Sequence, residues 1–264
     1  MKRVRSLSSE PPLLATYRAN PAAGAQHPAT AAAWVWGRFR KRAPDAYREL
    51  VEELARRQQG LCVYCEHRLV DEQGALIAER YQVEHVLPKS GAVGRALAWT
   101  NLALACWGMG SSSADKSCGA AKADRALPTG CEPRALPLLK PLVDVGTDGK
   151  FIVNAANCAL AGLSPQDVED TIAILNLDSD DSDRIRKPRQ DAGDVTRATV
   201  TQLLQALVAA NVAHAQQQQA FEELIASRLC PNAVGSILPF WSAERSALGA
   251  PAETWIANNQ GLFS

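Results

Sequence analysis

The chain has 264 residues, 47% of them hydrophobic, and its 28 Lys and Arg residues balance its 28 Asp and Glu residues. This length supports one large or two modest cores, and no run of eighteen apolar residues predicts a membrane-spanning helix. The first residues lack the apolar stretch of a secretory signal. We therefore expect a cytoplasmic protein, whose seven cysteines do not form a disulfide framework in that reducing compartment.

Charge is distributed unevenly along the chain. Residues 1–60 carry eleven basic and five acidic residues, a net charge of +6, whereas residues 131–264 carry ten basic and sixteen acidic residues, a net charge of −6. The densest basic cluster lies in "WGRFRKR" and contains Arg38, Arg40, Lys41 and Arg42. Cations beside aromatic rings suit nucleic acid, so these are candidate contacts. The solvent face of an ordinary helix gives the same pattern.

Hydrophobic periodicity predicts the elements in chain order. Residues 45–59 have apolar side chains at helical spacing and end at a glycine, so we expect a helix there. Alternation predicts a strand at about 79–87, and a hairpin should turn at 147–149. Ser164 is placed to cap a helix, and one or two long helices should cover 192–229. The chain thus divides into a basic helical segment (1–60), a core (61–130) and a mostly helical region (131–264).

Two cysteine pairs flank the middle of this core. "CVYC" supplies Cys62 and Cys65, and Cys106 and Cys118 follow, separated by a Gly/Ser-rich excursion. Four thiolates in this pattern predict a closed, structural zinc site. The alternatives are a redox pair in "CVYC" and buried, unreactive cysteines. Cys131 is the natural substitute if one ligand is misassigned.

A histidine and a carboxylate lie between the cysteine pairs, in "VEHVLPKS". Neighbouring residues of a regular strand point to opposite faces, so Glu84 and His85 can share a site only if the strand bends near Pro88. Metal-assisted phosphodiester hydrolysis needs these groups: His85 would accept the proton of a water molecule, and Glu84 would bind a divalent ion. Asn101, in "TNLALAC", is a candidate to orient His85.

The ordered motifs "CVYC", "VEHVLPKS", "WTNLALAC" and "CGAAK" resemble an HNH endonuclease with a four-cysteine zinc site. The flanks, including "LARRQQGLCVYCE", "GCEPR" and "TIAILNLDSDDSDRIRKPR", resemble the Septu-type (PtuB-like) and retron-associated HNH nucleases. The resemblance implies an α+β fold in which a zinc-stapled ββα-metal core lies between helical flanks. It also implies an antiviral-defence nuclease that acts with an ATPase partner.

The resemblance assigns roles to individual residues. It makes His85 the general base and Glu84 a ligand of catalytic Mg²⁺ or Mn²⁺. Asn101 matches the asparagine of the family's central motif. Lys122 matches the family's lysine, a candidate phosphate contact, and Lys89 is a second one. The last metal-binding position of the family is Gly119 here, a departure for which Asp115 or Asp124 are candidate replacements.

Two function classes therefore remain open. The first is a metal-dependent nuclease acting on nucleic acid, with DNA favoured over RNA or tRNA. The second is a catalytically weak or inactive, zinc-stapled subunit that binds nucleic acid or serves as a scaffold, which Gly119 favours. A thiol oxidoreductase using Cys62 and Cys65 is a third, less specific interpretation.

Overall fold

The computed structural model describes residues 2–20, 28–108, 116–179 and 184–263. Within these ranges the chain folds into α-helices, short 3-10 helices and two small antiparallel sheets, which agrees with the mixed α and β content that the sequence predicts. The predicted Gly/Ser-rich excursion and acidic loop fall largely on 109–115 and 180–183, outside the described residues. The described helices include none with the length and apolar character needed to cross a membrane.

The first segment forms helices α1 (Pro12–Ala19), α2 (Ala32–Arg42) and α3 (Pro44–Arg57). Helix α3 confirms the predicted helix at 45–59, with bounds that differ by one or two residues. Pro44 starts it, because the first turn needs no backbone donor there. Leu50 and Leu54 bury its apolar face, and Gly60, with φ of +77°, supplies the left-handed turn after its end.

The first sheet pairs strands β1 (Tyr81–His85) and β2 (Leu102–Cys106) in antiparallel register, with Tyr81 opposite Cys106 and His85 opposite Leu102. Strand β1 lies within the predicted strand at 79–87. Three short 3-10 helices, η3 (Lys89–Gly91), η4 (Arg95–Leu97) and η5 (Trp99–Asn101), connect the two strands. Helix α4 (Cys118–Lys122) follows and lies against β2.

The second sheet confirms the predicted hairpin. Strands β3 (Val143–Val145) and β4 (Phe151–Val153) pair antiparallel around a turn in which Gly149 has φ of +80°. Helices α5 (Ala155–Leu160) and α6 (Pro165–Ile174) follow. Ser164 caps α6 as predicted, since its hydroxyl accepts a hydrogen bond from the Asp167 backbone N–H while the Asp167 carboxylate accepts one from the Ser164 N–H.

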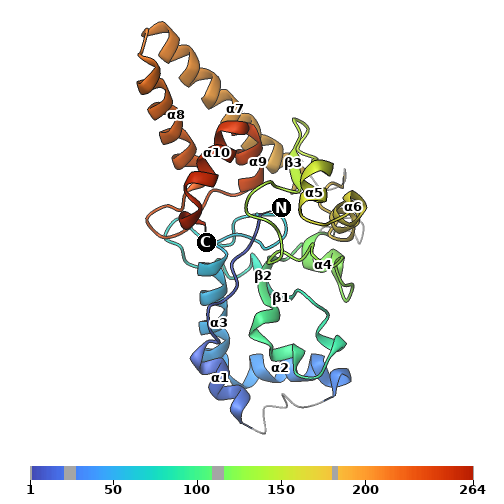
Figure 1. Ribbon diagram of the computed structural model, residues 1–264. Coiled ribbons are helices and arrows are strands. Elements are labelled where there is room, and N and C mark those ends of the chain that lie inside the picture. Colours follow the sequence, from blue (N-terminus) through green and yellow to red (C-terminus); the bar gives the residue numbers. More distant parts are fainter. Residues whose placement is uncertain (1, 21–27, 109–115, 180–183, 264) are drawn as a thin grey trace.

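The last region is a helical hairpin followed by two shorter helices. The hairpin consists of α7 (Arg186–Ala209) and α8 (His214–Leu229), so two helices cover the predicted range of 192–229 and the first begins earlier than predicted. Helices α9 (Trp241–Leu248) and α10 (Ala250–Asn258) and a final 3-10 turn, η6 (Gln260–Leu262), lie at the base of this hairpin, which extends away from the rest of the molecule (Figure 1).

The hydrophobic core joins all three sequence segments. One buried cluster runs from Val4 in the first segment through the cysteine region to Ala243 in α9. A second, smaller cluster holds α8, α9 and α10 together around Trp241. The cysteine region is therefore packed between the N-terminal helices and α9.

Candidate functional site

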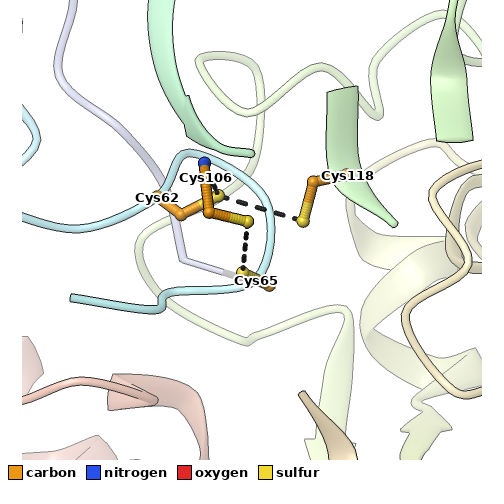
Figure 2. Close-up of side chains that lie close together, drawn as sticks. All are labelled: Cys62, Cys65, Cys106 and Cys118. Atoms are coloured by element: carbon orange, nitrogen blue, oxygen red, sulfur yellow. Dashed lines mark hydrogen bonds between the residues drawn. The ribbon is translucent and has the colours of Figure 1, made fainter. Parts of the chain in front are cut away.

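Four cysteine side chains converge at the centre of the molecule. Cys62 and Cys65 come from the loop after α3, Cys106 ends β2, and Cys118 begins α4. Their sulfur atoms all lie within 4.8 Å of one another, and Figure 2 shows all four side chains pointing into one space. The sulfur of Cys62 is 3.9 Å from that of Cys118, and that of Cys65 is 3.6 Å from that of Cys106. The predicted ligand set is thus assembled without Cys131.

Backbone hydrogen bonds hold the cysteine loop in shape. The N–H of Cys62 donates to the carbonyl of His67 at 2.8 Å, and the N–H of Glu66 donates to the carbonyl of Cys62 at 3.2 Å, which folds the loop into a tight knuckle. The N–H of Cys106 donates to the sulfur of Cys62 at 3.2 Å. This bond ties the knuckle to β2 and supplies the kind of donor that stabilises a thiolate.

The donor set fits a tetrahedral zinc ion. Zn–S bonds of about 2.3 Å place sulfurs about 3.8 Å apart, which matches the two shortest sulfur distances of 3.6 and 3.9 Å. Burial raises the pKa of the Cys62 thiol, but hydrogen bonds from the other three cysteines outweigh it and hold that pKa well below its usual value. The same network raises the pKa of Cys65 and Cys118. A dication bound between these sulfurs would favour the thiolate form of its ligands.

The geometry does not favour the redox interpretation. Cys62 and Cys65 each lie beside a cysteine from the second pair, in a knuckle that does not begin a helix, whereas a redox pair opens one. Cys158 is buried in the core, as predicted, while Cys230 is half-buried. Cys131 is buried as well, and its neighbour is Thr171 on α6.

A second feature, an open pocket of about 240 Å³, lies beside the cysteine cluster. Residues from β1, the following loop, α2 and α4 line it, and they include Trp36, Glu84, His85, Lys89, Gly119 and Asp124. Glu84 and His85 both line this pocket although they are neighbours on β1. Strand β1 ends at His85, and the chain turns at Pro88 into η3. The pocket therefore brings together Glu84 and His85, two of the three residues that the sequence assigned to catalysis, whereas Asn101 does not line it.

His85 is held in a defined orientation. Its Nε2 lies 3.0 Å from the carbonyl oxygen of Ala96, and because a carbonyl only accepts, Nε2 carries the proton and Nδ1 is the basic nitrogen. The ring of Trp36 packs edge-on against the imidazole, with centroids 4.9 Å apart. Burial, with the positive charge of Lys89 and Lys122, lowers the pKa of His85 to about 4. The imidazole is therefore neutral near pH 7, as a proton acceptor must be.

Glu84 is almost buried, with 8% of its surface exposed. Its Oε1 accepts a hydrogen bond from the Tyr64 hydroxyl at 3.1 Å and pairs with the ammonium of Lys122 at 3.0 Å. Burial raises the pKa of Glu84, while Lys122 and Tyr64 oppose that rise. These contacts use Oε1, and Oε2 faces the Cα of Gly119 on the wall of the pocket.

The structure corrects the assignment of Lys122 as a phosphate contact. Lys122 is 1% exposed, and besides its ion pair with Glu84 its ammonium donates to the carbonyls of His85, Ala123 and Arg125. A lysine with these partners inside the protein cannot reach a phosphate. Lys122 instead holds Glu84 and the end of β1 in position, because its ammonium contacts the side chain of Glu84 and the backbone carbonyl of His85.

The departure at Gly119 has a steric explanation. A Cβ at this position would overlap Oε2 of Glu84 and lie 3.1 Å from its Cδ, so only glycine leaves room for the carboxylate. We therefore expect a larger residue here to displace Glu84. Of the two candidate replacements for a metal ligand, Asp124 lines the pocket and is exposed, and Asp115 lies outside the described residues.

Asn101 is buried but does not hydrogen-bond to His85. Its side-chain oxygen accepts from the N–H of Leu87 at 2.8 Å, and its nitrogen donates to the carbonyl of Leu87 at 2.9 Å. The amide thus fixes the backbone two residues beyond His85. Any effect of Asn101 on His85 passes through this loop, which differs from the direct orientation that the sequence predicts.

The basic cluster lies next to the pocket because Trp36 anchors α2 against His85. Arg40, Lys41 and Arg42 are exposed, and Arg38 is half-buried with its guanidinium 5.2 Å from the ring of Trp34. Lys89 lies half-exposed on the pocket wall. Lys89 thus lies beside the candidate catalytic residues, and the other four cations lie on the helix whose Trp36 contacts His85.

Glu66 has a role that sequence reasoning missed. Its carboxylate is buried and accepts hydrogen bonds from the N–H of Ser242 at 2.7 Å and from its hydroxyl at 2.6 Å, at the start of α9. The Phe240 N–H donates to the Glu66 carbonyl. Ser242 lies 176 positions after Glu66 in the sequence, so local spacing does not reveal this contact. The sequence offers only one signal, an acidic residue directly after Cys65.

No family model matches this sequence, and no curated protein matches it. Two features of the chain itself indicate its chemistry: four clustered cysteine sulfurs with the geometry of a zinc site, and beside them a pocket that is lined by both His85 and Glu84.

Proposed function

We propose that this chain is a metal-dependent HNH endonuclease, which hydrolyses phosphodiester bonds of nucleic acid, with DNA the favoured substrate. The observation that carries the proposal is the pocket in which His85, fixed through Nε2 by the Ala96 carbonyl, lies beside the Glu84 carboxylate. Strands β1 and β2 with helix α4 would form the ββα-metal core, and the four cysteines would staple it with structural zinc.

In this proposal each side chain has one task. His85 accepts the proton of the attacking water at Nδ1, since Nε2 donates to Ala96. The Glu84 carboxylate would hold Mg²⁺ or Mn²⁺, which stabilises charge on the phosphate and leaving oxygen. Lys122 and Tyr64 keep Glu84 in place, and Asn101 holds the loop after His85. Carboxylate oxygen is the ligand type that these hard cations prefer.

Nucleic acid would approach along α2. Arg38, Arg40, Lys41 and Arg42 lie on this helix, and Trp36 of the same helix touches His85. Cations placed in this way would contact phosphates on either side of the scissile bond. Lys89, on the wall of the pocket, is the closest candidate to the reacting phosphate.

A role in antiviral defence with an ATPase partner is supported by the resemblance of the core and flanking motifs to Septu-type and retron-associated nucleases. The acidic region 131–264, with net charge −6, is the part of the chain less suited to grip phosphates and better suited to a protein partner.

The test is cleavage of plasmid DNA and total RNA by the purified, zinc-loaded chain with Mg²⁺ or Mn²⁺. The His85→Ala protein should lose about 10²–10⁴-fold in rate, which is the usual contribution of a positioned general base. The His214→Ala protein is the matched control, because His214 is exposed on α8, outside the pocket. Undiminished cleavage by His85→Ala would refute the mechanism.

The second candidate function is a zinc-stapled subunit that binds nucleic acid without cutting it. The pairing of Glu84 with buried Lys122 favours it, because the ammonium already neutralises the carboxylate that would bind the metal. In that case the unaltered chain would bind DNA with a salt-dependent affinity but cleave neither substrate at any Mg²⁺ or Mn²⁺ concentration.

A further inference from the structure

The outer part of the α7–α8 hairpin does not pack its side chains into a buried core. Helix α7 buries residues only in its first half, the last being Thr196, and α8 buries only Ile225 and Leu229 near its end. None of the residues from 201 to 220, all of which the structure describes, is buried. Figure 1 shows this end of the hairpin extending beyond α9 and α10.

This outer part also carries an apolar surface. Leu204 is 49% exposed and Val208 is 75% exposed, and because they are four residues apart on α7 they lie on the same face. Val200, Phe221 and Leu224 turn instead toward the cluster at the base of the hairpin. Two large apolar side chains, one turn apart, are therefore left in solvent at the far end of the molecule, as is typical of an interaction surface.

The same stretch is free of charged residues. Between Arg197 and Glu222 the sequence contains no Asp, Glu, Lys or Arg, although 21% of the whole chain is charged. The residues there are mostly Ala, Leu, Val, Thr and Gln. A surface of this kind does not select a partner by opposite charge. It can meet an identical surface without like-charge repulsion, and its glutamines can hydrogen-bond to one another across a two-fold axis.

We propose that the outer α7–α8 hairpin is a docking surface for a second copy of this chain. The two hairpins pair about a two-fold axis into a four-helix arrangement, with Leu204 and Val208 of both copies at the centre. In the dimer, the hairpin of each copy covers the exposed apolar side chains of the other. The active-site pocket lies at the opposite end of the molecule, on β1, α2 and α4, so each copy keeps its pocket open.

The size of the surface is that of a weak, transient interface. A face two helices wide and about twelve residues long buries roughly 400–500 Å² per copy, at the low end for a specific interface. We therefore expect a micromolar dissociation constant and a dimer that forms as concentration rises.

The experiment is sedimentation velocity of the full-length, zinc-loaded chain between about 1 and 100 µM, a range that brackets a micromolar equilibrium. The unaltered chain should pass from monomer to dimer. The double variants Leu204→Glu/Val208→Glu and Leu204→Lys/Val208→Lys should each remain monomeric, because like charges then meet at the axis. Mixing these two variants should restore the dimer, because opposite charges then meet.

Leu160→Glu is the matched control, because Leu160 is 66% exposed on α5, away from the hairpin, and this variant should dimerise like the unaltered chain. Zinc content and far-UV circular dichroism would verify that each variant is folded. The proposal is overturned if the unaltered chain stays monomeric up to about 100 µM, if the double variants dimerise undiminished, or if their mixture stays monomeric. A monomer whose double variants lose binding to a different protein would assign the surface to that protein instead.

Discussion

The cysteine cluster and the His85 pocket both use helix α4, and each uses one strand of the same sheet, β2 for the cluster and β1 for the pocket, but they have opposite characters. The cluster is closed, since four side chains supply every ligand that tetrahedral zinc takes and three of the four are fully buried. The pocket is open, with two carboxylates (Glu84 and Asp124), one imidazole and room for solvent. A closed site stabilises a fold, whereas an open site leaves positions for water and substrate. The two regions should therefore respond differently to substitution and to chelators.

The largest effect should come from breaking the closed site. Cys62→Ser should release zinc and unfold the chain, because structural zinc contributes about 10–16 kcal/mol in small zinc domains and a typical domain has only about 5–15 kcal/mol of net stability. Zinc per chain and the thermal unfolding midpoint are the measurements. Cys158→Ser and Cys230→Ser should keep the metal, and loss of zinc from either would mean that the ligand set is wrong.

A mild chelator should remove the catalytic Mg²⁺ or Mn²⁺ but leave the structural zinc bound. Oxygen ligands in an open pocket hold Mg²⁺ or Mn²⁺ weakly, whereas four thiolates hold zinc tightly and out of solvent. A mild chelator should abolish cleavage while zinc content stays at one ion per chain, and added Mg²⁺ should restore activity. Loss of activity only in step with loss of zinc would instead place catalysis at the cysteine cluster.

The buried ion pair between Lys122 and the pocket residue Glu84 is structural, and Lys122→Met tests it. Removing the ammonium leaves Glu84 buried without its ion-pair partner, which typically costs about 3–5 kcal/mol of stability. Urea unfolding measures this loss, and adding Glu84→Gln to Lys122→Met should recover much of it. Lys89→Met, at a half-exposed position on the same pocket, should change stability by no more than about 0.5 kcal/mol.

The smallest effect should come from adding a single methyl group at the wall of the pocket, with Gly119→Ala. Gly119→Ala forces Glu84 aside, and overpacking of this kind costs about 1–3 kcal/mol. We expect about a tenfold or larger fall in cleavage rate, with zinc retained. Gly37→Ala is the matched control, because nothing lies within 4 Å of a Cβ at that position on α2. A rise in activity for Gly119→Ala would show that Glu84 must move for catalysis.

Some features of this protein follow from the sequence alone because they depend on local spacing. The apolar stripe of α3, the glycine that ends it, the capped start of α6 and the β3–β4 turn are set by residues a few positions apart. The four cysteines were also identifiable, since zinc is among the few reasons to place thiols in two such pairs. The sequence likewise singled out Glu84 and His85, which the structure places together in one pocket.

Other features depend on contacts between distant segments, which spacing does not encode. Lys122 matched a phosphate contact in sequence, but the fold buries it against Glu84, 38 positions earlier. Asn101 matched an orienting residue, yet its amide bonds to Leu87. Gly119 looked like a lost ligand until the structure placed the Glu84 carboxylate in the space a side chain would fill. Tertiary packing decided these roles, because a buried polar group must find its partner wherever the fold places one.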